Sequence, residues 1–521
     1  MPQTLMPRVR AGAALAGLAT VVALAGCGSS SGGNSNADPA SITPASAPIY
    51  ASLVVKPEGD QKTQLEAVLK KVMRTDDPGG KIKALFDKST KKDGVTYDKD
   101  VKPWLGKRAG VFLTSATTSS ADYAVVLPTS DQGKALDSLR KGDKGIQKRS
   151  YRDVDYQVNS EKTATAAVGD DFVVGGTEPA LKAAIDTSKD SGKSITKEDD
   201  FTKASSEAGA DSLATFYMDP GELFDALARA GSVDRQTVTA LRQALSSAGV
   251  RAVGMGADAH ANGFTVTFAS IGAKASGVSG GDGAAALAGV PGDSWLGVGI
   301  GNLGGQIDNV LKQAGQLGGL AGVDVDQLFQ QLKQQSGLDI RADLIDWMGD
   351  AGLFVRGTSV GDIGGGLIVK SKDPAATARG IKRIGKLLRR QGQTVTSFRA
   401  SGVDTGITFK VSNALDVFLV AAGDRFIGVV GRPALDAALK SSEKLGDSPG
   451  FQQASSQLGE GLKPSVFFAM EPVLQLVDSA GAGSSSSYQQ VEPYLKAFTT
   501  IVAGGKRTGD VGKGRIVIGV K

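Results

Sequence analysis

Cysteine and histidine are almost absent from this chain, which contains one of each among 521 residues, Cys27 and His260. A single cysteine cannot form an intramolecular disulfide, so stability must come from the burial of apolar side chains. Zinc and iron sites usually draw on several Cys or His ligands, and we therefore expect neither a metal site nor a cofactor. Any Ser-His-Asp triad would have to use His260.

Aromatic residues are also scarce, at 6% of the chain, and charge of one sign is nowhere concentrated. The net charge of +5 arises from 59 Lys and Arg against 54 Asp and Glu, spread along the sequence. Nucleic-acid-binding proteins usually cluster their basic residues and add aromatic side chains on which bases stack. We therefore expect no nucleic-acid partner.

Residues 1–26 have the pattern of an export signal. Arg8 and Arg10 form a positive segment, and an apolar run follows over residues 11–26. This run is too short and too rich in Gly and Ala for a comfortable membrane span, which favours a cleaved signal peptide.

Leu24, Ala25 and Gly26 directly precede Cys27, and this order is similar to the lipobox of bacterial lipoproteins. The resemblance implies that the Cys27 sulfur takes a diacylglycerol and that Cys27 becomes the mature N-terminus. Each buried methylene of such an anchor contributes about 0.8 kcal/mol, and about two chains suffice for stable attachment. We expect a lipid-anchored protein on the extracytoplasmic face of the cell membrane.

Composition divides the remaining chain into two long segments. Residues 27–43 comprise the lipidated Cys and a flexible tether rich in Gly, Ser and Asn, and residues 272–289 form a second Gly-rich linker. They bound two predicted domains, residues 44–271 and 290–521.

The two predicted domains share blocks of similar sequence in the same order, an internal repeat of about 245 residues. The block 100–112 matches 343–354, which places Trp104 opposite Trp347. Further matched blocks are 65–71 with 307–313, 169–185 with 423–439, 201–209 with 451–459, and FYMDP with FAMEP. We interpret the chain as a tandem duplication of one domain and Trp104 and Trp347 as core residues.

Within each copy, short alternating runs predict strands, for example residues 122–128 and 163–168. Apolar residues spaced three and four apart predict helices, for example at 133–142, 179–187 and 233–248. Strands adjoin across short turns more often than across a crossover helix. The predicted fold class is α+β, with two tandem homologous domains that each contain a mainly antiparallel sheet with packed helices.

The block from Asp100 to Gly106, DVKPWLG, together with the lipobox, the tether and the closing hairpin, resembles the actinobacterial lipoproteins grouped as the domain of unknown function 3352. The resemblance spans nearly the whole mature chain. The second copy departs from the block by placing Asp346 where Pro103 would stand. The resemblance implies location and architecture, and it transfers no catalytic residue.

Three catalytic motifs have simpler explanations. His260 falls in the predicted turn of the hairpin that closes the first copy. Residues 357–361 fit G-x-S-x-G, but a strand-like run follows them, which predicts a hairpin turn in place of a nucleophile elbow. Residues 299–304 fit G-x-G-x-x-G, but the matched residues 52–57 contain no glycine, which favours close helix–strand packing over nucleotide binding.

The sequence therefore favours a non-catalytic binding protein of the cell envelope, whose partner is an envelope protein, a polymer or a lipid. One alternative is a carrier of lipid or another hydrophobic ligand, which would need an apolar cavity. A second alternative is an extracellular hydrolase that uses a pair of carboxylates in an open groove.

Overall fold

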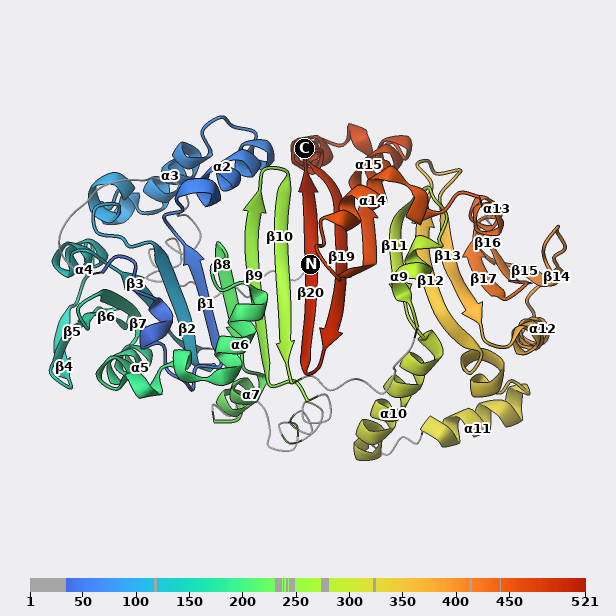
Figure 1. Ribbon diagram of the computed structural model, residues 1–521, viewed down its shortest axis with the longest axis horizontal. Helices are drawn as coiled ribbons and strands as arrows, with labels where there is room; N and C mark the ends of the chain where they lie inside the picture. Colours follow the sequence, from blue (N-terminus) through green and yellow to red (C-terminus); the bar gives the residue numbers. More distant parts are fainter. Residues whose placement is uncertain are drawn as a thin grey trace. The chain divides into compact units, whose positions relative to one another are not determined.

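The computed structural model describes residues 34–116, 120–229, 237, 239, 242, 249–272, 281–321, 325–412, 415–440 and 442–521. Their contacts divide the chain into two compact units. The first is Met1–Lys274 with Arg507–Lys513, and the second is Ala275–Lys506 with Gly514–Lys521. Each unit combines helices with antiparallel strands (Figure 1).

Antiparallel pairing joins the strands of the first unit into one sheet. In spatial order they are β4 (Gln147–Tyr151), β5 (Val154–Val158), β6 (Thr163–Val168), β7 (Phe172–Thr177), β3 (Ala121–Pro128), β2 (Arg108–Ala116), β1 (Ile49–Val54), β8 (Ala214–Met218), β9 (Ala252–His260) and β10 (Gly263–Ile271). In β1, Tyr50, Ser52 and Val54 are buried while the residues between them are half-buried. The alternation follows from the two-residue period of a strand.

Helices of the first unit cover both faces of this sheet. They are η1 (Pro39–Ile42), α2 (Gly59–Met73), α3 (Pro78–Ser89), η2 (Lys91–Asp93), η3 (Tyr97–Val101), α4 (Gln132–Leu139), α5 (Glu178–Lys189), η4 (Ser191–Lys193), η5 (Ile195–Lys197), α6 (Asp199–Ala208) and α7 (Pro220–Arg229). On one face η1, α5 and α6 bury a core that includes Phe112, Leu181 and Phe201. A second core, around Phe86 and Trp104, joins α3, η3 and α4 to the other face.

The second unit repeats this order of strands. Spatially they run β14 (Val395–Ser397), β15 (Thr405–Ser412), β16 (Leu415–Ala422), β17 (Arg425–Val430), β13 (Gly364–Ser371), β12 (Met348–Arg356), β11 (Ser294–Ile300), β18 (Lys463–Ala469), β19 (Phe498–Thr508) and β20 (Val511–Val520). Isolated bridges recur as well, because Pro44 pairs with Ser194 and Pro291 pairs with Lys444.

The helices of the second unit also follow the order of the first. They are α9 (Gly283–Ala288), α10 (Leu303–Ala321), α11 (Val325–Ser336), η6 (Arg341–Ile345), α12 (Pro374–Arg390), α13 (Arg432–Leu439), η7 (Leu445–Asp447), α14 (Pro449–Ser456), α15 (Met470–Ser479), η8 (Ala482–Ser484) and α16 (Ser486–Leu495). Local signals explain several starts. Asp131 caps α4 and Asp373 caps α12, each by accepting a hydrogen bond from a backbone N–H three residues on. The predicted α+β class with antiparallel strands is confirmed.

The two matched tryptophans make the same hydrogen bond in both units. Trp104 Nε1 donates to the Asp100 carbonyl at 2.5 Å, and Trp347 Nε1 donates to the Asp343 carbonyl at 2.8 Å. Both indoles are almost fully buried. In each unit the aspartate carboxylate also accepts a backbone N–H from four residues earlier. The prediction that Trp104 and Trp347 are core residues is confirmed.

Parts of both predicted linkers are folded. Within the predicted tether, Ala40 and Ile42 of η1 are buried in the first core. Within the predicted linker 272–289, residues 283–288 form α9, whose Leu287 is fully buried. These segments carry no helical signal in the sequence, because short segments of mostly small residues show no periodic spacing of large apolar side chains. Most of the predicted helix 233–248, and residues 273–280, lie outside the described residues.

Helix α9 packs so closely on β11 that glycine is required beneath it. A Cβ added to Gly299 would lie 1.9 Å from the carbonyl oxygen of Gly283 in α9. The third glycine of the motif, Gly304, is in α10, where an added Cβ would lie 2.5 Å from the Ile345 carbonyl oxygen and 2.9 Å from that of Met348, the first residue of β12. The expected explanation of the G-x-G-x-x-G motif, close helix–strand packing, is confirmed.

We predict that Gly299→Ala lowers the free energy of unfolding by about 1–3 kcal/mol or more, because backbone must move to admit the methyl group. The control is Gly361→Ala, since a Cβ at Gly361 meets no atom within 4 Å. Urea unfolding of both variants would measure the difference, and equal stability of the two would contradict the packing argument.

Candidate functional site

The residues of the expected lipid anchor, Leu24, Ala25, Gly26 and Cys27, lie outside the described part of the chain. Among the described residues, no helix has both the length and the apolar character needed to cross a membrane. Lipidation of Cys27 therefore remains a prediction from the sequence.

His260 is the last residue of β9, beside the tight turn to β10. The side chain is exposed, and its Nε2 lies 2.9 Å from the Thr265 hydroxyl on the paired strand. That contact joins neighbours within one hairpin, and the described contacts give His260 no carboxylate partner of the kind that a triad uses. The arrangement matches the expected exposed hairpin histidine.

Residues 357–361, the G-x-S-x-G segment, form the turn between β12 and β13. The nearly buried Arg356 holds this turn by pairing with Asp293 and with Asp362, at 3.0 Å to the latter. These two carboxylates, Asp293 first, raise the pKa of Arg356. The segment is a hairpin turn, as predicted, and no helix follows the serine to make a nucleophile elbow.

Carboxylates in the described residues mostly have structural partners. Asp98 pairs with Lys83 at 3.2 Å, and Asp100 pairs with Lys141 at 3.0 Å. Across the described ranges, no three Asp, Glu, His or Cys residues gather closely enough to hold a metal ion.

An apolar surface on one face of the second unit's sheet is the first candidate site. Residues opposite one another on paired strands share a face. Register therefore places Leu296, Val298, Leu353 and Val355 on one face of β11 and β12. The same register adds Leu367, Val430, Val466, Phe468 and Ile501 from β13, β17, β18 and β19. We call these nine residues the apolar face.

The apolar face is only partly covered. Helix α10 contacts β12 and α15 contacts β11, yet Leu353 keeps 40% of its surface exposed and Val430 keeps 37%. A β-bulge between Ser294 and Leu296 also turns Trp295 against Phe468, with ring centroids 6.2 Å apart. Contiguous exposed apolar surface is typical of binding sites.

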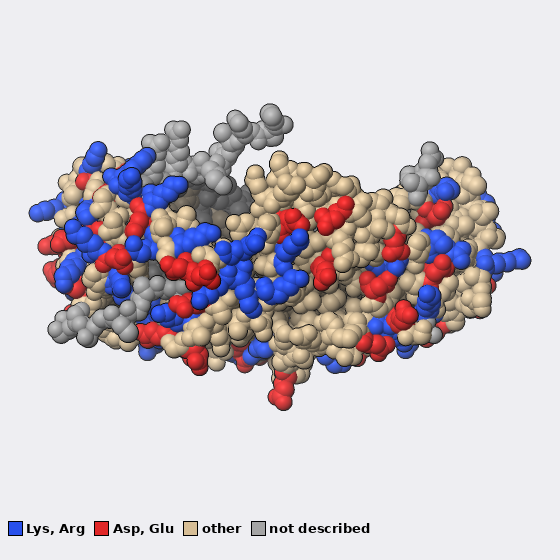
Figure 2. All heavy atoms as spheres, turned by 90° about the horizontal axis from the view of Figure 1, so that it is seen from above, with Lys and Arg blue, Asp and Glu red and all other residues tan. Residues whose placement is uncertain are grey.

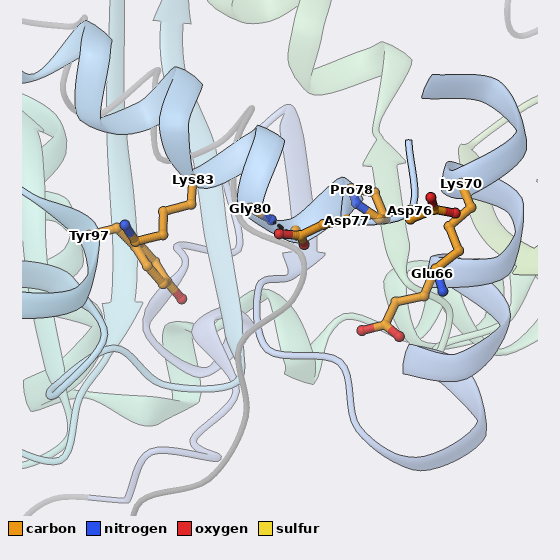
Figure 3. Close-up of a pocket in the computed structure, with 9 residues that line it drawn as sticks. Glu66, Lys70, Asp76, Asp77, Pro78, Gly80, Lys83 and Tyr97 are labelled. Carbon is orange, nitrogen blue, oxygen red and sulfur yellow. Dashed lines mark hydrogen bonds between the residues drawn. The ribbon is translucent and has the colours of Figure 1, made fainter. Parts of the chain in front are cut away.

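A polar cavity in the first unit is the second candidate site (Figure 3). It has a volume of 210 Å³ and lies where α2, α3 and η3 meet, and we call it the α2–α3 cavity. Its lining consists of Glu66, Lys70, Asp76, Asp77, Pro78, Gly79, Gly80, Lys83 and Tyr97. Asp77 caps α3 by accepting the Gly80 N–H at 2.7 Å, which fixes this loop against the helix.

Tyr97 is the unusual member of the α2–α3 cavity. The residue is 5% exposed, and its buried hydroxyl has no hydrogen-bond partner among the described residues. Its ring packs edge-on against Phe86. Burial, with a contribution from Asp98, raises the pKa of Tyr97 to about 12, so the hydroxyl stays protonated at neutral pH.

A second polar cavity, of 380 Å³, lies in the second unit around Asp350 and Lys372. Most of its polar side chains are already paired. The Asp350 carboxylate accepts the N–H groups of Asn302 and Asp282, at 2.8 and 3.0 Å, and Lys372 donates to the Asn302 side chain at 2.7 Å. This cavity therefore offers a ligand few unused hydrogen-bonding groups.

The sequence did not single out the apolar face or the α2–α3 cavity. The signal for the first was present, because β12 and β18 carry large apolar side chains at consecutive positions, which predicts that both faces of these strands are apolar. Nothing local marks Tyr97, whose isolation depends on α2 and α3 folding over it. Charged side chains of both signs stand side by side over much of the surface drawn in Figure 2, as the mixed sequence suggests.

Comparisons with individual known proteins give no close match. No curated protein matches the chain. Crystal structures of TP0453 match with a TM-score of 0.24, at 10% identity for crystal form IV and 12% for forms III and I. These matches cover 45–46% of this chain and 79–82% of TP0453, and so low a score does not establish a shared fold.

The model of a family described as "Protein of unknown function (DUF3352)" matches residues 9–501. The match includes both repeated segments, in agreement with the resemblance found from the DVKPWLG block. The chain belongs to the DUF3352 family of proteins of unknown function.

Proposed function

We propose that the protein is an exported lipoprotein, anchored to the outer face of the cell membrane through Cys27, that binds a partner without catalysing a reaction. The observation that carries the binding role is the apolar face of the second unit. Nine apolar side chains from β11, β12, β13, β17, β18 and β19 share that face, and two of them are more than one-third exposed.

The geometry of the apolar face favours a partner that is itself apolar. Covering half-exposed Leu, Val and Phe side chains contributes roughly 25 cal/mol for each Å² removed from water. The nearby hairpin adds Val360 and Ile363, at 63% and 42% exposure. A flat or extended apolar partner, such as a hydrophobic segment of an envelope protein, would cover this surface.

A carrier of lipid or another hydrophobic ligand is the second candidate function, and the same face favours it. An acyl chain laid across Leu353, Val298 and Val466 would bury these side chains in the same way. The two functions differ in the species that should co-purify with the protein from the membrane. A binding protein should carry a polypeptide, and a carrier should carry a lipid.

We predict that Cys27→Ala abolishes membrane attachment. Without the sulfur no diacylglycerol can be added, and the roughly 0.8 kcal/mol per buried methylene is lost. Membrane fractionation with intact mass measurement would show the unmodified chain outside the membrane fraction. A Cys27→Ala protein that still sediments with membranes and still carries the acyl mass would contradict the anchor.

We further predict that Leu353→Lys removes the species that co-purifies with the native protein. A charge on the apolar face must be desolvated when a hydrophobic partner covers it. Native mass spectrometry, with lipid extraction, of protein from the host membrane is the measurement, and the control is Val411→Lys, at a position 68% exposed outside the apolar face.

Two results of that experiment decide the role of the apolar face. Loss of a bound lipid or polypeptide from Leu353→Lys alone supports the proposal, and the identity of the lost species separates the two functions. An equal amount of the species on both variants would show that binding does not use the apolar face.

A further inference from the structure

Helix α3 and the turn after it carry positive charge that the fold leaves unpaired. Residues 78–92 contain five lysines and a single acid, Asp87. Asp87 pairs with Lys83 at 3.1 Å, and Lys83 also pairs with Asp98 at 3.2 Å. The other four lysines are exposed, and none pairs with a carboxylate of the described residues. They are Lys81, Lys88, Lys91 and Lys92.

Helical spacing places two of these lysines and a leucine on one outward face of α3. Lys81, Leu85 and Lys88 are four and three residues apart, so they are neighbours on the helix surface. Phe86, on the inner side of the helix, is buried in the core around Trp104, which fixes this orientation. Leu85 keeps 55% of its surface exposed between the two lysines. An exposed apolar side chain flanked by lysines is typical of helices that lie in a membrane interface.

The fold that the two units share does not require a basic helix at this place. Helix α11 precedes η6 in the second unit as α3 precedes η3 in the first. Its 12 residues contain one lysine, one aspartate and five glutamines. The same architecture therefore forms without the lysines of α3, and their charge needs an explanation other than folding.

The described chain begins at the end of the first unit where α3 packs. The Ser35 carbonyl accepts the Lys107 N–H at 2.8 Å, and Lys107 follows the turn of Trp104, against which α3 packs. Asn34, the first described residue, stands seven positions after Cys27. A lipid on Cys27 would therefore bring this end of the first unit to the membrane surface. Figure 2 looks onto the side of the first unit on which Figure 1 places α3, and Lys and Arg side chains gather there.

We propose that the outward face of α3 lies on the anionic phospholipids of the membrane, with the four unpaired lysines at the phosphates and Leu85 at the boundary of the acyl chains. Anionic lipid surfaces attract lysines that are held within about one Debye length of them. The inference deepens the proposed function, on which it rests for the place of the protein beside a membrane. A vesicle experiment needs no anchor, so it separates failure of this contact from failure of the anchor.

The test is co-sedimentation of the chain from residue 28 onward, which lacks the anchor and keeps every described residue, with phospholipid vesicles. We expect binding to vesicles rich in phosphatidylglycerol, none to pure phosphatidylcholine, and release as added salt screens the charges. Lys81→Gln together with Lys88→Gln should weaken binding about 30-fold, because each lysine at an anionic surface contributes about fivefold. Leu85→Gln should weaken it about tenfold through loss of the inserted apolar side chain.

The matched control exchanges two lysines on the opposite side of the first unit's sheet. Lys189 of α5 and Lys197 of η5 are exposed and make no ion pair within the described ranges. Lys189→Gln together with Lys197→Gln should bind vesicles as the parent chain does. All the substituted side chains are exposed, so each variant should unfold at the parent's temperature, which excludes a folding defect.

Vesicle binding that is lost in the α3 variants alone supports the proposal, whatever the fractionation of Cys27→Ala shows about the anchor. Absence of binding to phosphatidylglycerol, equal binding to phosphatidylcholine, or α3 variants that bind like the parent would overturn it. Sedimentation velocity without vesicles tests a second copy of the chain as the occupant. A dimer that Leu85→Gln dissociates would assign the face to that copy and overturn the proposal as well.

Discussion

Both faces of each sheet carry apolar side chains, and this constraint shapes the rest of the molecule. A strand with one apolar face needs helices on one side only, whereas these strands need cover on two. On the first face, short helices rich in alanine and glycine pack directly on the backbone, as α9 does over Gly299. On the second face the cover is uneven, and the apolar face of the second unit is only partly covered.

The turn that contains Trp104 or Trp347 closes one end of the second face in both units. In the second unit, Trp347 packs with Ala351, Val369 and Phe426, and in the first, Trp104 packs with Phe86 and Leu127. The indole N–H returns to the carbonyl of an aspartate four residues earlier, so the bulky ring is buried with its polar atom satisfied. The two tryptophans at equivalent positions thus solve the same packing problem in the same way.

Sequence patterns predicted most of the fold and little of the candidate sites, for physical reasons. Alternation and helical spacing are local, so strands such as β3 and helices such as α5 were predicted within a few residues. Helix α9 was missed because its alanines and glycine give no apolar periodicity, and η1 because four residues are too few to show one, although Leu287 and Ile42 anchor them. The exposure of Leu353 and the isolation of the Tyr97 hydroxyl depend on which helices arrive from elsewhere in the chain, and no local pattern contains that information.

The burial of Ala40 and Ile42 in η1 also fixes how far the folded part can stand from its anchor. The Asn34 N–H already donates to the Asp171 carboxylate and the Ser35 carbonyl accepts the Lys107 N–H, so only residues 28–33 separate Cys27 from folded structure. A fully extended chain gains about 3.3–3.6 Å per residue, so an anchor on Cys27 would hold the first unit within about 25 Å of the lipidated residue. So short a connecting segment would restrict the protein to partners that lie close to the membrane or extend toward it.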